Sequence, residues 1–297
     1  MTFDGPIAIL GGSGQLGSEV CKLLSGRLGV VAPGRQTLDL ACLADVRIWL
    51  DGNQPNLIIN TAAYTDVDGA ESHKDAAYTL NSDLPSVLAN WCRKNGARLL
   101  HFSSDYTLRG LDNVAQDEKA LVLPLNWYGK TKAIGDAAIK KSQCEALILR
   151  TSWVYSDHHK NFMLSIIRQA FQKEIIRVVN DQVGTPTPAH WLAEIAVTCV
   201  DQWNPAMPEL MNAVPEGFIS WLGFAEAIVA ILVKNGFEVR AKELKPVTSL
   251  SLGQAAVRPN NSRLSNKKLA GFVGKPLDNW TAFLHDLACN AARQIQK

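Results

Sequence analysis

The sequence predicts an α/β protein with a doubly wound parallel sheet and a smaller C-terminal lobe. Two observations support this prediction. Short apolar runs alternate with helix-like segments through the first half of the chain, an order that produces a parallel sheet with right-handed crossovers. A glycine-rich turn also follows the first apolar run directly, where a strand passes into a helix. After Tyr155 the alternation loosens, and we expect the second half to build most of the smaller lobe.

The chain begins with an apolar strand at residues 7–10 and a helix at residues 18–24, joined by glycines. Strand, glycine turn and helix in this order form a Rossmann-type dinucleotide-binding context. Gly11 would allow the tight turn, Gly14 would let the backbone approach a pyrophosphate, and Gly17 would let helix and strand pack closely. The alternative is a glycine-rich turn without a ligand. The residues that we expect to contact the cofactor here are Gly11, Gly14, Gln15, Leu16 and Gly17.

The same reasoning extends along the chain. Apolar runs predict strands at residues 30–32, 57–60, 98–104 and 146–154, and helical spacing predicts helices at residues 76–94 and 223–234. We expect an NAD(P)-binding domain from residues 1–155 and about 184–206, and a substrate-binding lobe from about 156–183 and 207–297.

Tyr128 and Lys132 are four residues apart, a spacing that places both side chains on one face of a helix. A phenol has an unperturbed pKa of about 10, and a cation held close to it in a half-buried cleft lowers that pKa. We therefore expect Tyr128 to be a proton donor whose pKa is lowered by Lys132. A solvated helix surface is the alternative, because this spacing is common by chance.

The predicted strand at residues 98–104 ends in polar groups, Ser103, Ser104 and Asp105. In open α/β sheets, ligands bind at the carboxyl ends of strands. Ser104 is therefore expected to hydrogen-bond a substrate carbonyl, although a polar turn or a helix cap is the usual role of such residues.

Cofactor choice depends on the end of the second predicted strand. Proteins that select NAD usually place an acid there, against the ribose 2′-hydroxyl, and residues 32–36 contain none. Arg35 is suited to a 2′-phosphate, with a surface arginine as the alternative. We expect NADPH, with NADH still open.

Composition excludes several classes of protein. The 30 basic and 28 acidic residues nearly balance, which gives no electrostatic basis for binding nucleic acid or a membrane. The six cysteines are widely separated and lack zinc-site spacing, so we expect reduced thiols in a cytoplasmic protein. No leader or long apolar run is found. His158 and His159 are adjacent and have no third ligand nearby, so we expect no metal.

Together these motifs resemble the extended short-chain dehydrogenase/reductase family, and within it the branch that reduces the 4-keto group of dTDP-linked deoxysugars. The resemblance runs through most of the chain. Besides the glycine turn, the serine strand and the Tyr-Lys pair, it includes the segments 59–71, 150–155, 161–162, 181–187 and 258–264.

The resemblance implies reduction of the C4 keto group of dTDP-4-dehydro-6-deoxy-L-mannose to dTDP-L-rhamnose. It places Lys132 on the nicotinamide ribose hydroxyls. Asp39 and Leu40 would lie by the adenine, and Ala62, Ala63 and Tyr64 along the cofactor. For the nucleotide sugar, we expect Asp105 to orient the sugar, Trp153 to stack on sugar or base, and Arg258 and Ser262 to bind the diphosphate.

Two departures from that branch keep alternatives open. Leu108 and Arg109 replace an aromatic residue and an acid, so a reductase or epimerase of another nucleotide sugar remains open. Gln15 replaces a glutamate that binds Mg²⁺ in some relatives, so no metal is expected. A related branch is a non-catalytic, NADP-binding regulatory subunit of methionine adenosyltransferase, and Ser104, Tyr128 and Lys132 argue against that role. A homodimer is also left open.

Overall fold

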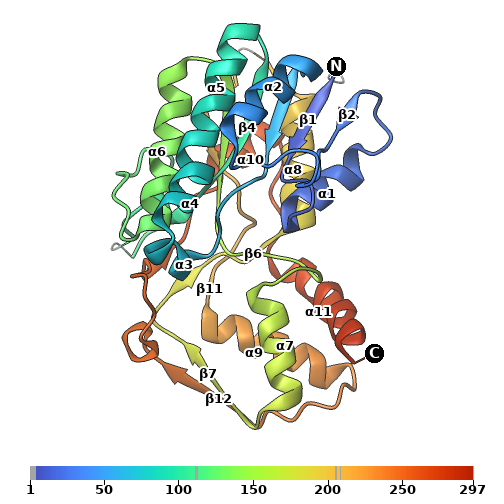
Figure 1. The fold of residues 1–297 in the computed structure, drawn as a ribbon. Helices are drawn as coiled ribbons and strands as arrows, with labels where there is room; N and C mark the ends of the chain where they lie inside the picture. The colour runs from blue at the N-terminus through green and yellow to red at the C-terminus, as the bar shows by residue number, and fades with distance from the viewer. Residues whose placement is uncertain (1–4, 111–112, 205, 208, 297) are drawn as a thin grey trace.

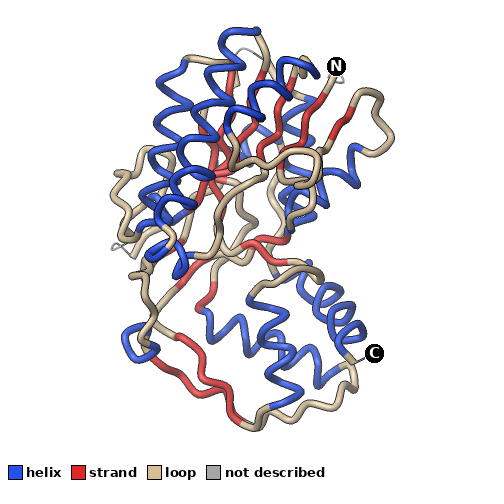
Figure 2. The backbone as a smooth tube through the Cα atoms, viewed as in Figure 1, coloured by secondary structure: helices blue, strands red, loops and turns tan. Residues whose placement is uncertain are grey.

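The computed structural model describes residues 5–110, 113–204, 206–207 and 209–296. Figure 1 shows a large sheet flanked by helices, with a smaller lobe of helices and short strands below it. The first described residues lie on the sheet unit, and the C-terminal helix lies on the outer side of the lobe (Figure 2).

The large sheet has six strands, all parallel, in the order β10-β5-β4-β3-β1-β2. Its strands are β1 (Ile7–Leu10), β2 (Val30–Val31), β3 (Leu57–Asn60), β4 (Arg98–Ser104), β5 (Glu145–Thr151) and β10 (Leu210–Asn212). Most of their residues are buried on both faces, because helices cover both sides; this is why they appear in the sequence as continuous apolar runs. The predicted Rossmann-type α/β fold is confirmed.

Each face of the sheet has its own hydrophobic core. One core joins the sheet to α1 (Gln15–Leu24), α8 (Ala189–Asp201) and α10 (Lys267–Val273). The opposite core joins it to α2 (Leu43–Asn53), α5 (Leu84–Asn95) and α6 (Trp127–Ser142). The chain order reverses at β1, so the loops after β1 and β3 separate toward opposite faces and leave a crevice at the carboxyl end of the sheet.

The lobe has a third core of its own. Its main elements are α7 (Phe162–Gln172), α9 (Trp221–Lys234) and α11 (Thr281–Ile295), with β7 (Ile175–Val179) parallel to β12 (Glu243–Val247). Short strands join the two units: β6 (Val154–Tyr155) pairs with β9 (Thr187–Pro188), and β8 (Val183–Gly184) pairs with β11 (Ile219–Ser220) and β13 (Asn261–Ser262). The remaining elements are α3 (Val67–Ser72), α4 (Lys74–Tyr78), and the short η2 (Asp105–Thr107) and η3 (Ser249–Leu252).

The long helix expected at residues 76–94 is interrupted by one π-helical turn, Thr79–Asp83, between α4 and α5. The side chain of Asn81 in this turn accepts a hydrogen bond from the Tyr64 N–H and donates to the Tyr64 carbonyl and to the Thr131 hydroxyl. The wider turn thus directs a polar side chain into the packing between α4–α5 and α6, which periodicity could not predict.

The division of the chain into two domains stays a proposal. Residues 184–206 supply α8, which packs on α1. The division that we expected from sequence gives residues 207–297 to the lobe, yet β10 is the edge strand of the large sheet and α10 packs against it. We therefore propose that β10 and α10 belong with the sheet unit.

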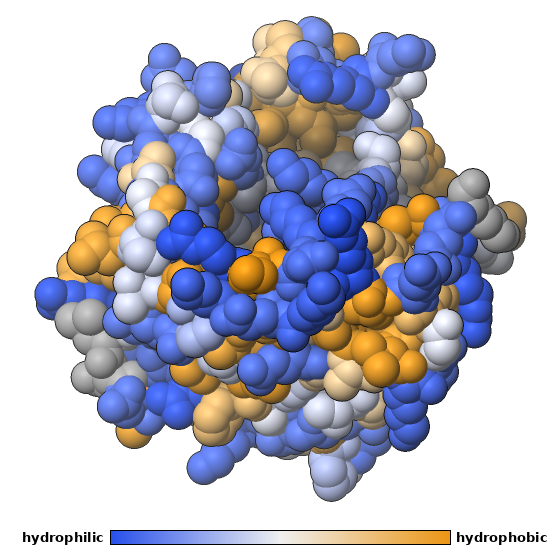
Figure 3. All heavy atoms as spheres, turned by 90° about the horizontal axis from the view of Figure 1, so that it is seen from below, coloured by the Kyte–Doolittle hydropathy of each residue, from blue (hydrophilic) through white to orange (hydrophobic). Residues whose placement is uncertain are grey.

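Among the described residues, no helix is long and apolar enough to cross a membrane. All six cysteines are free thiols; Cys92, Cys199 and Cys289 are buried and Cys42 is exposed. Viewed from the lobe end, the surface is a mosaic of hydrophilic and smaller apolar areas (Figure 3).

Candidate active site

The glycine turn has the geometry that its three glycines were expected to provide. Gly11 adopts φ +81°, and a Cβ added there would lie 2.7 Å from the Ala62 nitrogen. A Cβ on Gly17 would lie 2.1 Å from the Gly11 carbonyl oxygen, so α1 can start close to β1 only because position 17 is glycine. Gly14 is the N-cap of α1 and brings no side-chain cap. The first amides of α1 are therefore available to an anion, which the helix dipole also favours.

A cavity of about 720 Å³ opens at the carboxyl end of the sheet, between the sheet loops and the lobe. Most of the site residues that were predicted from the sequence line this cavity. Those that line it are Gly11, Gly14, Gln15, Leu16, Arg35, Asp39, Leu40, Ala62, Ala63, Ser104, Asp105, Tyr128, Lys132 and Trp153. Gly17, Tyr64, Arg258 and Ser262 are not among its lining residues.

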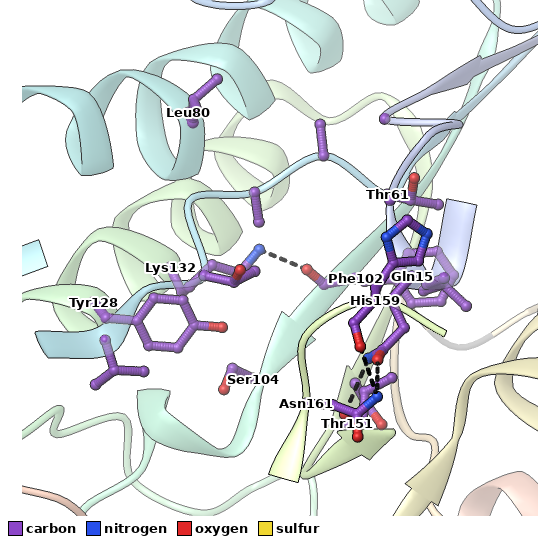
Figure 4. Close-up of a pocket in the computed structure, with 18 of the residues that line it drawn as sticks. Gln15, Thr61, Leu80, Phe102, Ser104, Tyr128, Lys132, Thr151, His159 and Asn161 are labelled. Atoms are coloured by element: carbon purple, nitrogen blue, oxygen red, sulfur yellow. Dashed lines mark hydrogen bonds between the residues drawn. The ribbon is translucent and has the colours of Figure 1, made fainter. Parts of the chain in front are cut away.

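Helix α6 delivers Tyr128 and Lys132 to the cavity. Asn126 caps it by accepting a hydrogen bond from Gly129 N at 2.7 Å. Two glycines let the helix approach its neighbours: a Cβ on Gly129 or Gly135 would lie 2.1 Å from the carbonyl oxygen of Tyr106 or Asn81, respectively. Figure 4 shows the Tyr128 hydroxyl and the Ser104 hydroxyl on the same side of the cavity, with Lys132 beside the tyrosine ring.

The expectation that Lys132 lowers the pKa of Tyr128 is wrong. Burial raises the pKa of Tyr128 to about 12, the nearby Asp105 and Asp136 carboxylates raise it further, and only a hydrogen bond with Ser104 lowers it. Lys132 instead donates to the Phe102 carbonyl oxygen at 2.6 Å (Figure 4). The Tyr128 hydroxyl therefore stays protonated at neutral pH, the state that a proton donor needs.

Lys132 is itself almost completely buried, with 2% of its surface exposed. Burial lowers its pKa to about 8, while the carboxylate of Asp136 raises it. Its second polar neighbour is His101, whose Nε2 lies 3.2 Å from the Lys132 Nζ. The inner side of the ammonium is therefore hydrogen-bonded to β4, and its outer side faces the cavity.

Ser104 and Asp105 form a small polar group at the end of β4. The Ser104 hydroxyl donates to the Asp105 Oδ1 at 3.0 Å and accepts from the Tyr106 N–H. Burial raises the pKa of Asp105 to about 6, and hydrogen bonds from Ser262 and Ser104 lower it in part. The second carboxylate oxygen of Asp105 is buried without a hydrogen-bond partner among the described residues, and the residue lines the cavity. Ser262 thus reaches the site through Asp105.

Trp153 lies on the lobe side of the cavity in an unusual conformation. Its φ is +47°, a strained value for a bulky residue, and its ring stacks on Trp221 at 3.5 Å between centroids and 9° between planes. A Cβ on Gly184 would lie 2.6 Å from the same ring. The sequence prediction did not name Trp221, which also lines the cavity, because nothing in its local pattern separates it from a core tryptophan.

Arg258 lies outside the cavity lining, in a bidentate ion pair. Its guanidinium donates to both Asp68 oxygens, at 3.1 and 2.7 Å, and to the Ala256 carbonyl. A hydrogen bond also joins it to Tyr106, which does line the cavity. Arg258 thus connects α3 of the sheet unit to the loop before β13.

Arg35 lies on the loop after β2 and is exposed at the cavity edge, as a residue that binds a 2′-phosphate must be. Asp39 accepts a hydrogen bond from the Ala41 N–H at 3.1 Å and so stabilises the same loop. Leu108 is 2% exposed and packs against Val214 and Leu264. Neither Leu108 nor Arg109 lines the cavity, so the departure at these positions changes packing beside the site rather than its lining.

Gln15 joins the glycine turn to the crossing between the two units. Its Oε1 accepts from the Ser156 hydroxyl and the Asn161 amide, both at 3.0 Å, and its Nε2 donates to the Val154 carbonyl at 3.0 Å. Figure 4 shows Asn161 and Gln15 on the cavity side opposite Tyr128. The sequence offered a signal for Asn161, a helix-capping residue before an apolar helix, but no signal for its contact with the glycine turn.

No cluster of three or more metal-ligating side chains is found in the described part of the chain. His158 contacts Ser18, Glu19 and Asp157.

Comparison with known proteins gives a consistent result. A family model described as the RmlD substrate binding domain matches residues 5–292. The dTDP-4-dehydrorhamnose reductase of Burkholderia thailandensis is 32% identical over 285 residues, which cover 92% of this chain and 95% of that protein. The enzyme of the same name from Escherichia coli K12 is 30% identical over 280 residues, with 92% and 94% covered.

Solved structures agree in fold over the full length. The dTDP-4-dehydrorhamnose reductase of Clostridium acetobutylicum superimposes with a TM-score of 0.88 at 30% identity, covering 98% of this chain and 100% of that one. That of Bacillus anthracis, solved in complex with NADP, gives 0.86 at 27% identity, covering 96% and 99%.

Proposed function

Because this chain belongs to the RmlD substrate binding domain family, we propose that it is an NADPH-dependent dTDP-4-dehydrorhamnose reductase. It reduces the C4 keto group of dTDP-4-dehydro-6-deoxy-L-mannose and yields dTDP-L-rhamnose, a building block for polysaccharides. NADH remains the second choice of cofactor.

The main support for this proposal is that the candidate catalytic residues and the glycine turn share one cavity. Ser104 at the end of β4 and Tyr128 and Lys132 on α6 line the same cavity as the glycine turn before α1, so three separate parts of the chain meet there. A protein that only binds a dinucleotide needs the glycine turn and does not need a buried phenol beside a serine hydroxyl. The shared cavity therefore favours a reductase over a regulatory subunit.

The residues fit the cofactor. The uncapped N-terminus of α1 suits the pyrophosphate, Arg35 suits the 2′-phosphate, and the ammonium of Lys132 suits ribose hydroxyls. When bound, NADPH supplies a hydride to the C4 carbon of the sugar. Tyr128 donates its proton to the developing alkoxide oxygen, so that hydride and proton together convert the ketone to a hydroxyl group.

The remaining polar groups prepare the carbonyl for this step. Ser104 donates a hydrogen bond to the carbonyl oxygen and stabilises negative charge as it develops there. Asp105 lines the cavity beside Ser104, where its carboxylate would accept a sugar hydroxyl. Trp153 and Trp221 supply an aromatic wall for the sugar or the base. Arg258 and Ser262 support the cavity from outside its lining, through Tyr106 and Asp105 respectively.

The test is a turnover assay on the purified protein. NADPH and dTDP-4-dehydro-6-deoxy-L-mannose should give cofactor oxidation in proportion to substrate consumed, with dTDP-L-rhamnose as the product and no partner protein required. Reduction of a different nucleotide sugar alone would overturn the substrate assignment. Binding of NADPH with no reduction of any nucleotide sugar would overturn the assignment as an enzyme.

We place the enzyme in the cytoplasm, because all six cysteines are unpaired, as is usual in reducing compartments. A homodimer stays a proposal that sedimentation of the purified chain would test.

A further inference from the structure

Two polar side chains interrupt the apolar interior behind Lys132. Asn60, the last residue of β3, and His101, in β4, are register partners on adjacent strands. Each is 1% exposed. Neither lines the cavity, and the proposed reaction so far gives them no role. A buried polar pair must satisfy its own hydrogen bonds, so their pattern can be worked out atom by atom.

The orientation of Asn60 is fixed by the backbone. The Ala62 N–H donates to the Asn60 Oδ1 at 3.2 Å, so the NH₂ group of the amide faces the other way. There the Asn60 Nδ2 lies 3.1 Å from the His101 Nδ1. An amide NH₂ can only donate, so Nδ1 must be the acceptor and carries no hydrogen.

The ring of His101 therefore carries its hydrogen on Nε2. Burial and the nearby Lys132 hold the pKa of His101 well below its ordinary value, so the ring is neutral and has a single N–H. Since Nδ1 accepts from Asn60, that hydrogen is on Nε2, the atom that lies 3.2 Å from Lys132 Nζ and 3.8 Å from Asp136 Oδ1.

This tautomer restricts what Lys132 can do. A protonated Nε2 cannot accept a hydrogen bond, so its 3.2 Å contact with the Lys132 Nζ is a contact between two donors that repels the ammonium toward the cavity. The inward hydrogen bond from Lys132 goes to the Phe102 carbonyl oxygen. The other ammonium hydrogens remain for the cavity side. If Nε2 were unprotonated, the ammonium could donate a second hydrogen bond to it, and this bond would be directed into the protein.

We propose that Asn60 and His101 are positioning residues for Lys132: Asn60 holds His101 as its Nε2–H tautomer, and this tautomer leaves the ammonium directed into the cavity. The group that Lys132 then holds, the ribose of the nicotinamide cofactor, rests on the function proposed above. We call the control of the His101 tautomer by Asn60 the tautomer lock. This lock does not depend on the proposed function.

The charged surroundings of Lys132 are compatible with this role. From its own helix, Tyr128 and Asp136 face it; from β5 Arg150 lies near Asp136, and from η2 Asp105 lies beside Tyr128. The Oδ2 of Asp136 accepts a hydrogen bond from Ser103, and its Oδ1 has no hydrogen-bond partner among the described residues. The Nε2 of His101 lies 3.8 Å from this oxygen, and negative charge there favours hydrogen on Nε2.

The tautomer can be read directly by nitrogen NMR of histidine-labelled protein, with the His101 signals assigned by their loss in His101→Gln. We expect a protonated-type Nε2 and an unprotonated-type Nδ1, unchanged from about pH 6 to pH 8 because the ring stays neutral. A protonated Nδ1, or a ring that titrates in this range, would overturn the lock. Neither result depends on whether the protein reduces a nucleotide sugar.

Asn60→Asp tests the effect on Lys132. The carboxylate still accepts from Ala62 N–H, but it also accepts from His101, so the ring hydrogen should move to Nδ1 and Nε2 should become an acceptor. Lys132 can then donate inward, and the dissociation constant for NADPH should rise at least threefold, with a smaller effect on the thermal midpoint of the NADPH-free protein. A tautomer that switches with no loss of NADPH affinity would refute the positioning role. If this variant does not fold, the NMR result on the unaltered chain still decides whether the lock exists.

Discussion

At the residue scale, the proposed chemistry depends on a phenol that burial keeps protonated. The raised pKa of Tyr128 means that almost every molecule carries the proton at neutral pH. Its transfer becomes favourable only toward a stronger base, and the alkoxide formed at C4 is one. Tyr128 therefore suits reduction better than the reverse oxidation, which would need the ionised phenol.

Tyr128→Phe should lower kcat by about 10²–10⁴, the usual contribution of general acid catalysis. Only the hydroxyl is removed, and the edge contact of the ring with Tyr106 is retained, so folding and NADPH affinity should be unaffected. Steady-state kinetics together with NADPH titration give both values. Near-normal turnover would exclude Tyr128 as the proton donor.

Asp105→Asn should change how stability depends on pH. The pKa of Asp105 is raised to about 6 in the folded protein, so folding favours the protonated carboxyl. Its stabilisation is full below the unfolded pKa, is lost as pH rises through the folded value, and amounts to as much as about 3 kcal/mol. The variant should lack this decline between about pH 4 and pH 6. Urea unfolding at both ends of this range measures it, and parallel pH profiles would contradict the prediction.

Arg35→Ala should weaken NADPH binding more than NADH binding. A charge-assisted contact with the 2′-phosphate is worth roughly 1.5–3 kcal/mol, or about 10- to 100-fold in affinity. Arg47, an exposed arginine on α2 that does not line the cavity, provides the matched control as Arg47→Ala. Equal losses for the two cofactors would remove Arg35 from the site.

At the scale of elements, glycines set how closely helices approach the sheet. Three glycines lie so close to a carbonyl oxygen that a Cβ added to any of them would be 2.1 Å from that oxygen. They are Gly17 on α1 and Gly129 and Gly135 on α6. These three approaches place the N-terminus of α1 and the Tyr128 helix at opposite sides of one cavity. A shift of either helix would separate the proposed cofactor site from the proposed proton donor.

Gly17→Ala should lower the free energy of unfolding by about 1–3 kcal/mol, the usual cost of overpacking, and weaken NADPH binding because the start of α1 must move. Gly52→Ala is the control: it also lies in a helix, has no neighbour within 4 Å of the added Cβ, and should stabilise by about 0.5–1 kcal/mol. Thermal melts with and without NADPH separate the two effects. A Gly17→Ala variant as stable as Gly52→Ala would show that α1 can shift freely.

At the scale of the whole molecule, the site lies between two units that meet through polar contacts. Gln15 binds the chain where it crosses toward the lobe, and the Asp68–Arg258 ion pair connects α3 to the loop before β13. Trp153, held in its positive φ at this crossing, stacks on Trp221 from the lobe. The substrate side of the cavity therefore depends on how the two units are held together.

Arg258→Ala should raise the KM for the nucleotide sugar more than it lowers kcat, because Arg258 supports the cavity wall through Tyr106 and does not touch the reacting carbon. Loss of the bidentate pair should also cost about 1–2 kcal/mol of stability. Lys242→Ala, which removes the exposed Lys242–Glu174 pair within the lobe, is the control and should change neither. A loss confined to kcat would place Arg258 at the reacting carbon instead.

The sequence by itself determined the strands of the sheet other than β10 and the glycine turn, and it supplied the candidate reacting groups. Buried parallel strands must be apolar on both faces, so β1, β3 and β4 could be predicted within a residue, and the turn after β1 requires glycine for steric reasons. Short-range spacing also placed Tyr128 and Lys132 on one helix face. All of these depend on neighbours in the chain.

Only the tertiary structure decided the electrostatics of the site and the contacts across it. The raised pKa of Tyr128, the attachment of Lys132 to Phe102, the Trp153–Trp221 stack and the Asn60–His101 pair each join segments that are far apart in the chain. The pKa of a buried group depends on desolvation and on charges that three-dimensional packing brings close. The local spacing of Tyr128 and Lys132 could therefore indicate candidate reacting groups, but it could not show that Lys132 donates to the Phe102 carbonyl or that burial raises the pKa of Tyr128.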